Sequence, residues 1–163
     1  MIFVKFVHKY CSIVMSIVLF VLLLSGCAVI APRKELAEPR DIQKKKAMDF
    51  FIEGKVAETK ENYPQAITSY MEALQYDPES EEIILALATA LVNDGKIRSA
   101  LYFTRLALRI NPSNPDSWRM LKYLEQREGR IDKAAEALEV YIKLNPEVKF
   151  IDYIQLAWYY LEL

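Results

Sequence analysis

The sequence predicts an all-α protein, a solenoid of about three and a half stacked helical hairpins after an export signal and a short tether. Three observations predict this fold class. A residue pair ending in proline recurs every 34 residues, at Asp77-Pro78, Asn111-Pro112 and Asn145-Pro146. A small residue recurs at the same interval, at Ala66, Ala100 and Ala134. Side chains suited to a buried helix face recur at spacings of three and four, at Ile97, Ala100, Leu101, Thr104, Ala107 and Leu108.

Residues 1–26 are expected to form a secretory signal peptide. Lys5 and Lys9 precede an uncharged apolar run, and small residues follow that run. The last of these residues resemble the lipobox of bacterial lipoproteins: Leu24, Ser25, Gly26 and Cys27. The resemblance implies that Cys27 is the lipid attachment site, acylated with chains such as palmitate, and becomes the mature N-terminus. We therefore expect membrane attachment through acylated Cys27 at the cell envelope, with the remaining chain facing the periplasm.

An uncleaved transmembrane anchor is the alternative for the same segment. Residues 10–31 are 22 uncharged residues, which is enough to cross a bilayer core of about 30 Å. In both cases the lysines precede the apolar run, so the repeats are expected outside the cytoplasm. Ala28 follows Cys27, and lipoproteins of enteric-type bacteria that lack Asp there resemble those sorted to the outer membrane, which favours that membrane.

Residues 27–46 are expected to be a polar tether that merges into the first helix, because they contain Pro32 and Pro39 and end in three lysines. The 34-residue period then divides the chain into three repeats and the beginning of a fourth. The expected boundaries are residues 47–80, 81–114, 115–148 and 149–163.

The residues at fixed places in these repeats resemble the tetratricopeptide repeat (TPR) family. Matching residues in the first repeat are Phe50, Gly54, Ala66, Tyr70, Ala73 and Pro78. Those in the second are Leu87, Ala88, Gly95, Ala100, Ala107 and Pro112, and those in the third are Trp118, Leu121, Gly129, Ala134 and Pro146. In the third repeat Lys122, Glu125 and Tyr141 depart from the family's small or aromatic residues. The resemblance implies that each repeat forms two helices, A and B, and that the repeats stack into a curved solenoid.

The helix ends are predicted by glycine, proline and capping residues. Gly95 and Gly129 stand where a left-handed residue would end helix A. Pro64 and Pro115 suit the first turn of a helix, and the residues suited to N-caps are Ser80 and Asn114.

The last repeat is expected to be a helix A alone. Tyr153, Leu156, Ala157 and Tyr160 fit the helix A pattern of the earlier repeats if one extra residue is allowed. Residues from Phe150 to Leu163 are mostly apolar, so one face is expected to be exposed. Such a face indicates a fragment of a longer repeat protein, a docked partner, or self-association through Phe150 to Leu163.

The composition excludes most catalytic and metal chemistry from the mature chain. The only histidine, His8, and one of the two cysteines, Cys11, lie in the signal segment. We therefore predict no catalytic, metal-binding or cofactor-binding residues and no enzymatic activity. Removing residues 1–26 takes away two lysines, so the formal charge changes from -1 to -3. A slightly acidic chain without a basic stripe disfavours nucleic-acid binding.

The TPR resemblance implies a binding groove along the helices A. We expect it to hold a protein or peptide partner, with these candidate residues: Phe51, Lys55, Leu85, Thr89, Asn93, Arg119, Tyr123, Arg127 and Trp158. The carboxylate clamp of chaperone-binding TPR proteins is not matched. The family's Lys, Asn and Arg clamp positions are occupied by Phe51, Lys55, Ala86, Asp116 and Met120.

These features together predict a lipid-anchored scaffold for protein–protein interactions. The layout resembles repeat lipoproteins that serve pilus or secretin assembly, outer-membrane protein insertion, or recruitment of cell-wall hydrolases. Two alternatives remain open: the N-terminal regulatory region of a longer enzyme or assembly protein, and a homo-oligomeric structural protein.

Overall fold

The computed structural model describes residues 39–163, and every regular element in this range is an α-helix. The helices are α2 (Arg40–Thr59), α3 (Tyr63–Tyr76), α4 (Glu81–Asn93), α5 (Ile97–Ile110), α6 (Pro115–Arg127), α7 (Ile131–Leu144) and α8 (Phe150–Glu162). The all-α prediction is confirmed for this range. No helix in it combines the length and the apolar character needed to cross a membrane. Cys27 and the predicted signal peptide lie outside the described residues.

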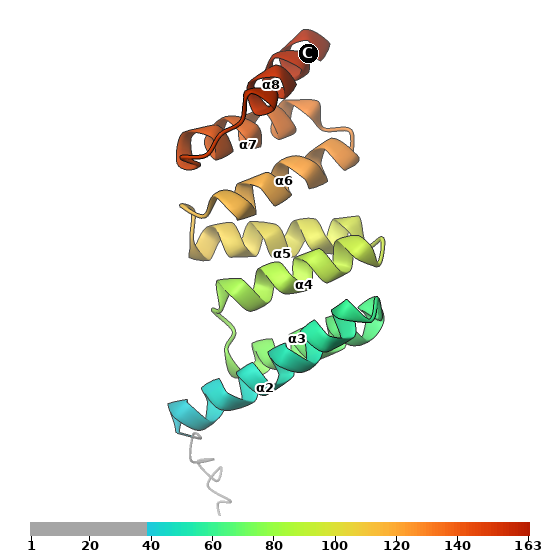
Figure 1. The fold of residues 1–163 in the computed structure, drawn as a ribbon, viewed down its shortest axis with the longest axis vertical. Helices are drawn as coiled ribbons and strands as arrows, with labels where there is room; N and C mark the ends of the chain where they lie inside the picture. Colours follow the sequence, from blue (N-terminus) through green and yellow to red (C-terminus); the bar gives the residue numbers. More distant parts are fainter. Residues whose placement is uncertain (1–38) are drawn as a thin grey trace, which may run out of the picture. The chain divides into compact units, whose positions relative to one another are not determined.

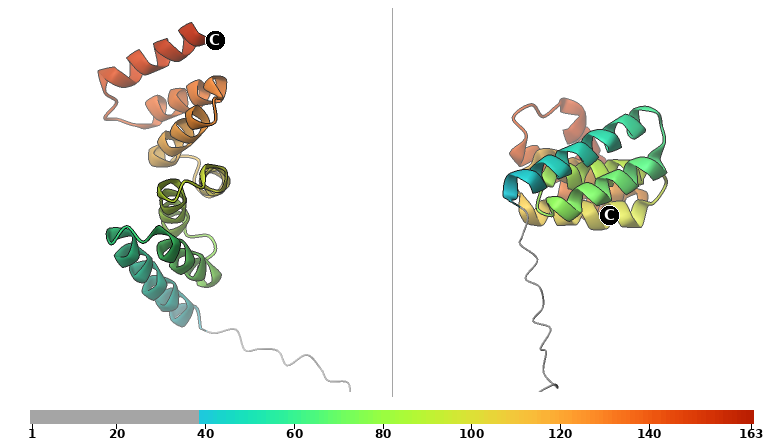
Figure 2. Two further views of the ribbon diagram at one scale, coloured as in Figure 1. Left: turned by 90° about the vertical axis from the view of Figure 1, so that its right-hand side faces the viewer. Right: turned by 90° about the horizontal axis from the view of Figure 1, so that it is seen from below.

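The helices form three hairpins and a final unpaired helix. Helices α2 and α3, α4 and α5, and α6 and α7 are the helix pairs, and each helix packs mainly on its neighbours in the sequence. The pairs are stacked in chain order, and α8 lies beyond α7 (Figures 1 and 2). Helices α2, α4, α6 and α8 are therefore the A helices, and α3, α5 and α7 are the B helices.

The repeated alanines allow the helices to approach closely. Ala66, Ala100 and Ala134 are completely buried. Thr104 is also completely buried, and its hydroxyl donates to the Ala100 carbonyl at 2.9 Å, so burial leaves no unpaired hydroxyl. One core cluster extends from α2 to α6, and a second joins α7 to α8.

The helix ends lie where the glycines and caps predict them. Gly95 and Gly129 end helices A with φ values of +75° and +73°. Glu61 occupies the same place in the first repeat with a φ of +57°. A side chain in this left-handed region carries a steric cost that glycine avoids. The expected caps also form, because the Ser80 hydroxyl accepts from the Ile83 amide at 3.4 Å and the Asn114 carbonyl oxygen accepts from the Asp116 amide at 2.8 Å.

The first helix begins earlier than residue 47. Pro39 stands at its N-cap and α2 starts at Arg40, so residues 40–46 are helical and do not continue the tether. The physical reason is that Arg, Gln and Lys favour helices and no proline or glycine follows Pro39 in this segment.

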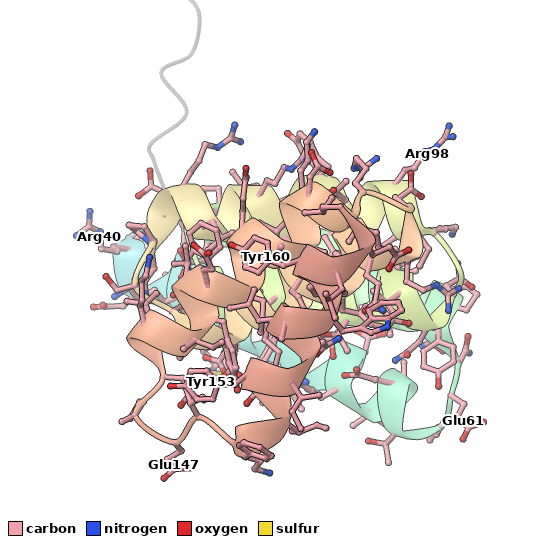
Figure 3. All side chains as sticks on the ribbon, turned by 90° about the horizontal axis from the view of Figure 1, so that it is seen from above. Arg40, Glu61, Arg98, Glu147, Tyr153 and Tyr160 are labelled. Atoms are coloured by element: carbon pink, nitrogen blue, oxygen red, sulfur yellow. The ribbon has the colours of Figure 1, made fainter. Side chains whose placement is uncertain are left out.

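The register of α8 differs from the predicted one, which allowed one extra residue. Tyr159 is completely buried, whereas Tyr153 and Tyr160 are 53% and 54% exposed (Figure 3). The prediction with one extra residue was therefore wrong for these two tyrosines, and the unbroken 34-residue spacing places Tyr159 at the position of Glu125. The Tyr159 hydroxyl accepts from Gln155 Nε2 and donates to Gln126 Oε1, both at 2.8 Å. These bonds allow its burial because no polar atom is left unpaired.

Candidate functional site

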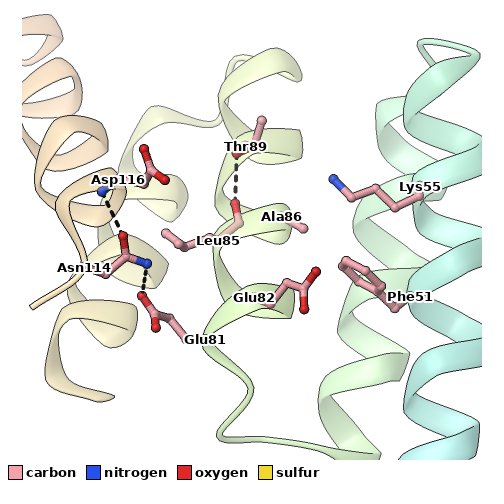
Figure 4. Close-up of a pocket in the computed structure, with 9 residues that line it drawn as sticks. All are labelled: Phe51, Lys55, Glu81, Glu82, Leu85, Ala86, Thr89, Asn114 and Asp116. Carbon is pink, nitrogen blue, oxygen red and sulfur yellow. Dashed lines mark hydrogen bonds between the residues drawn. The ribbon is translucent and has the colours of Figure 1, made fainter. Parts of the chain in front are cut away.

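An open pocket lies along the A helices of the three hairpins. It has a volume of about 370 Å³ and is bordered by α2, α4 and the beginning of α6 (Figure 4). Its lining residues are Phe51, Lys55, Glu81, Glu82, Leu85, Ala86, Thr89, Asn114 and Asp116. Four of the predicted groove residues thus share one pocket: Phe51, Lys55, Leu85 and Thr89.

One part of the pocket wall is apolar. Phe51 is half-buried and lies against the buried ring of Tyr70, with ring centroids 5.7 Å apart. Ala86 lies on the side of α4 toward Phe51, and the Leu85 side chain extends from the same helix toward α6 (Figure 4). A wall of this kind gives a partner apolar surface to bury, and apolar burial contributes about 25 cal/mol per Å².

Lys55 enters the pocket from α2 but is held by its own helix. Its Nζ is 3.2 Å from Glu58 Oε2, and it lies 5.7 Å from the ring centroid of Phe51 and 6.0 Å from that of Tyr70. Glu58 therefore neutralises the one lysine of the pocket.

Glu81 connects α4 to the start of α6. Its carboxylate accepts hydrogen bonds from Asn111 Nδ2 at 2.8 Å and Ser117 Oγ at 3.3 Å, and also from Asn114 Nδ2 (Figure 4). These donors are neutral, so they fix the carboxylate without cancelling its charge. Glu81 is thus both a structural link between repeats and a source of negative charge in the pocket.

Glu82 and Asp116 were not among the predicted groove residues. Each is the second residue of its repeat, so the 34-residue spacing was the signal that could have found them. Asp116 pairs with Arg119 at 2.7 Å, which places that predicted residue beside the pocket. Glu82 is exposed and makes no hydrogen bond or ion pair among residues 39–163.

The other predicted groove residues lie outside this pocket. Asn93 and Tyr123 are exposed, and the Arg127 guanidinium lies 6.0 Å from the Tyr123 ring centroid. Trp158 is 53% exposed on α8. The 34-residue spacing places Ala157, and not Trp158, at the position of Thr89 and Tyr123.

A polar chain of contacts joins α6 to α8 next to these residues. Lys122 Nζ donates to Gln155 Oε1 at 3.0 Å. Gln155 Nε2 then donates to the Tyr159 hydroxyl, which donates to Gln126 Oε1. Burial lowers the pKa of Lys122, and the nearby Asp152 opposes this effect. Lys122 therefore serves helix packing at a position where the family carries a small residue. Residues 39–163 contain no group of three His, Cys, Asp or Glu side chains placed to hold a metal ion.

Comparison of the sequence with known proteins gives distant relatives, and no family model matches the chain. Protein NPGR1 of Arabidopsis thaliana is 27% identical over 94 residues, which are 56% of this chain and 14% of NPGR1. The photosystem I assembly protein Ycf3 of Synechococcus sp. (strain CC9605) is 25% identical over 125 residues, covering 66% of this chain and 72% of Ycf3. The chain thus spans only a small part of the first relative.

Solved TPR structures resemble the helical stack. The first TPR of Spaghetti (RPAP3), bound to the HSP90 peptide SRMEEVD, has a TM-score of 0.67 and 19% identity over 73% of this chain and 94% of its own. The Yersinia enterocolitica type III secretion chaperone SycD, in complex with a peptide of the translocator YopD, has a TM-score of 0.68 and 12% identity over 75% of this chain and 98% of its own. The fold of residues 39–163 is therefore a TPR-type helical solenoid.

Proposed function

We propose that this protein is a lipid-anchored scaffold that binds a peptide segment of another protein in its groove at the bacterial cell envelope. The observation that carries the proposal is the pocket along α2, α4 and α6, where Phe51, Leu85 and Ala86 offer apolar surface between charged side chains. Two proteins with similar folds, RPAP3 and SycD, were solved with bound peptides. The lipobox-like residues before Cys27 support the anchor.

The anchor and the groove should be separable by two substitutions in one experiment. Cells producing the full chain are treated with a crosslinker, and the protein is purified from the detergent-solubilised membrane fraction. Cys27→Ala should move the protein out of the membrane fraction or leave it unprocessed, because firm attachment requires acyl chains. Leu85→Gln should keep the protein in the membrane fraction but reduce the crosslinked partner by about tenfold, since it removes apolar surface from the pocket.

Met71→Gln is the matched control for the groove arm. Met71 lies on α3, is 52% exposed and does not line the pocket. The Met71→Gln protein should capture as much partner as the unsubstituted protein. Equal loss in both variants, or no partner after crosslinking, would contradict the scaffold function. Membrane retention of a fully processed Cys27→Ala protein would contradict the lipid anchor.

Self-association through α8 is a second candidate, and the exposed side chains of α8 favour it. The large apolar residues exposed on this helix are Phe150, Ile151, Ile154, Trp158 and Leu161, and Leu163 directly after it is also exposed. If a second copy covers this face, replacing Ile151 and Leu161 together with lysine should convert an oligomer into a monomer, because both side chains are more than half exposed and neither is needed for the core. Light scattering after gel filtration measures the mass. Met71→Lys should leave the mass unchanged, and an unsubstituted protein that is already monomeric excludes this candidate.

A further inference from the structure

The charges of the pocket are unequally neutralised. Glu58 pairs with Lys55, and Arg119 pairs with Asp116. Within the described chain, no cation pairs with Glu81 or Glu82. The acidic end of the pocket, which we define as Glu81 and Glu82, therefore keeps two negative charges.

The two glutamates have different roles at this end. Glu81 is fixed by three neutral donors and its charge contributes to the local potential. Glu82 projects from α4 toward the space in front of Phe51 (Figure 4). Carboxylates in the first turn of a helix are stabilised by the helix dipole, and this effect is available to an acid on any side of that turn. The dipole therefore stabilises the charge of Glu82, but it does not explain why this carboxylate lies on the side of the turn that faces Phe51.

This arrangement fits the two parts of a lysine or arginine side chain. Such a side chain has an apolar stem and a charged head, and it buries the stem along apolar surface while the head finds a charged partner. Phe51 and Leu85 offer the apolar surface, and the carboxylates of Glu82 and Glu81 offer the partner. The Phe51 ring already has Lys55 Nζ 5.7 Å from its centroid, so it offers the stem apolar surface and leaves the cation to the carboxylates.

Resting on the proposed peptide-binding function, we propose that the α2–α4–α6 pocket selects a cationic side chain, lysine or arginine, in an extended segment of the partner protein. The pocket is thus opposite in charge to a carboxylate clamp. Asp116 and Ala86 stand where the clamp carries Lys and Asn, and both line this pocket. The acidic HSP90 peptide SRMEEVD bound to RPAP3 is the type of ligand that this pocket should reject.

The test uses a cellulose-bound array of random peptides of about twelve residues, probed with the full chain purified in detergent. Each peptide is synthesised in three versions, with Lys, Gln or Glu at one central position. The unsubstituted protein should bind the Lys version about tenfold more strongly than the Glu version, because an attractive charge pair replaces a repulsive one. Glu82→Gln should reduce this ratio, and Glu82→Lys should reverse it.

Glu136→Lys is the matched control because it makes the same charge change at an exposed residue of α7 that does not line the pocket. It should keep the preference for Lys. Circular dichroism melting of each variant confirms that the repeats remain folded. A preference for Glu, or equal binding of all three versions, overturns the cation selection. If Leu85→Gln abolishes peptide binding in either of these two cases, the proposed groove function stands without the cation selection. If neither Leu85→Gln nor Glu82→Lys changes peptide binding, or if no peptide binds, both the groove function and the cation selection are overturned.

Discussion

Replacing Gly54 with valine should destabilise the folded repeats by about 3 kcal/mol, through overpacking against a buried tyrosine. A Cβ atom at Gly54 would lie 2.5 Å from Cδ1 and 3.0 Å from Cζ of Tyr70, with Cε1 also in collision. Real side chains do not approach so closely, so either the tyrosine ring or helix α2 must move. The strain should exceed the gain of about 1 kcal/mol that removal of a mid-helix glycine can bring.

Tyr70 has little freedom to move away from the added side chain. It is completely buried, and its hydroxyl donates to Glu58 Oε2 at 2.8 Å. Burial and the hydrogen bond to Glu58 raise the pKa of Tyr70 above its ordinary value. Phe51 packs against the same ring. The collision would therefore also disturb one wall of the pocket.

Urea unfolding measured by circular dichroism gives the free energy of unfolding for this test. Tyr70→Leu alone should also destabilise the protein, because it removes ring contacts and the bond to Glu58. In the double variant the two losses should not add, because the smaller side chain leaves room for valine. Purely additive losses would show that the Gly54–Tyr70 contact is not the cause.

Replacing Glu125 with alanine should cost about 3 kcal/mol, the second large effect expected for this protein. Glu125 is 1% exposed on α6, between arginines from two other helical segments. Arg105 Nη2 of α5 lies 2.5 Å from its Oε1, and Arg130 Nε, at the N-cap of α7, bonds to its Oε2. One buried carboxylate thus connects α5, α6 and the start of α7.

The loss should arise from the broken ion pairs and from the cavity left at Glu125. Among residues 39–163, Arg105 loses its one ion pair without Glu125, and Arg130 keeps only its contact of 3.5 Å with Glu128. Truncating Glu125 removes the buried partner of both arginines and leaves a cavity, while the Arg105 and Arg130 side chains are 50% and 32% exposed and keep contact with water. Thermal unfolding in parallel with Glu125→Gln separates the two effects, because glutamine keeps most of the volume.

Glu136→Ala is the control for this prediction. Glu136 lies on α7, is exposed and has no hydrogen bond or ion pair among residues 39–163. Its removal should leave the melting temperature unchanged. If Glu125→Ala melts at the same temperature as Glu136→Ala, the ion-pair cluster does not hold these helices together.

Glu125 also marks a limit of the sequence pattern. The TPR resemblance identifies it as a departure from an aromatic position, but neither of its arginine partners could be predicted. Arg105 is 20 residues away and belongs to the preceding helix. Whether the two meet depends on the packing angle and the side-chain rotamers of both helices, which residue spacing does not contain.

Only part of the candidate site could be predicted, because residue spacing does not contain the packing angles and rotamers that bring side chains together. The repeat spacing brought Phe51, Lys55, Leu85 and Thr89 to one pocket because residues at equal places in stacked repeats share a face. It could not indicate that Glu81 would be bound by Asn111, Asn114 and Ser117, whereas Glu82 has no hydrogen bond or ion pair among residues 39–163. That distinction requires the relative positions of α4 and α6.

The sequence by itself determined the repeat length, the helical hairpins and their ends. These are local properties, because proline, the capping residues and the left-handed Gly95 and Gly129 act within a few residues of the chain. The tertiary structure decided which of the two possible registers of α8 packs on α7, which arginines pair with Glu125, and which carboxylates of the pocket keep their charge. Tyr159 shows the physical reason, because its burial depends on hydrogen bonds that include Gln126 on another helix. Such contacts are fixed only when the helices pack.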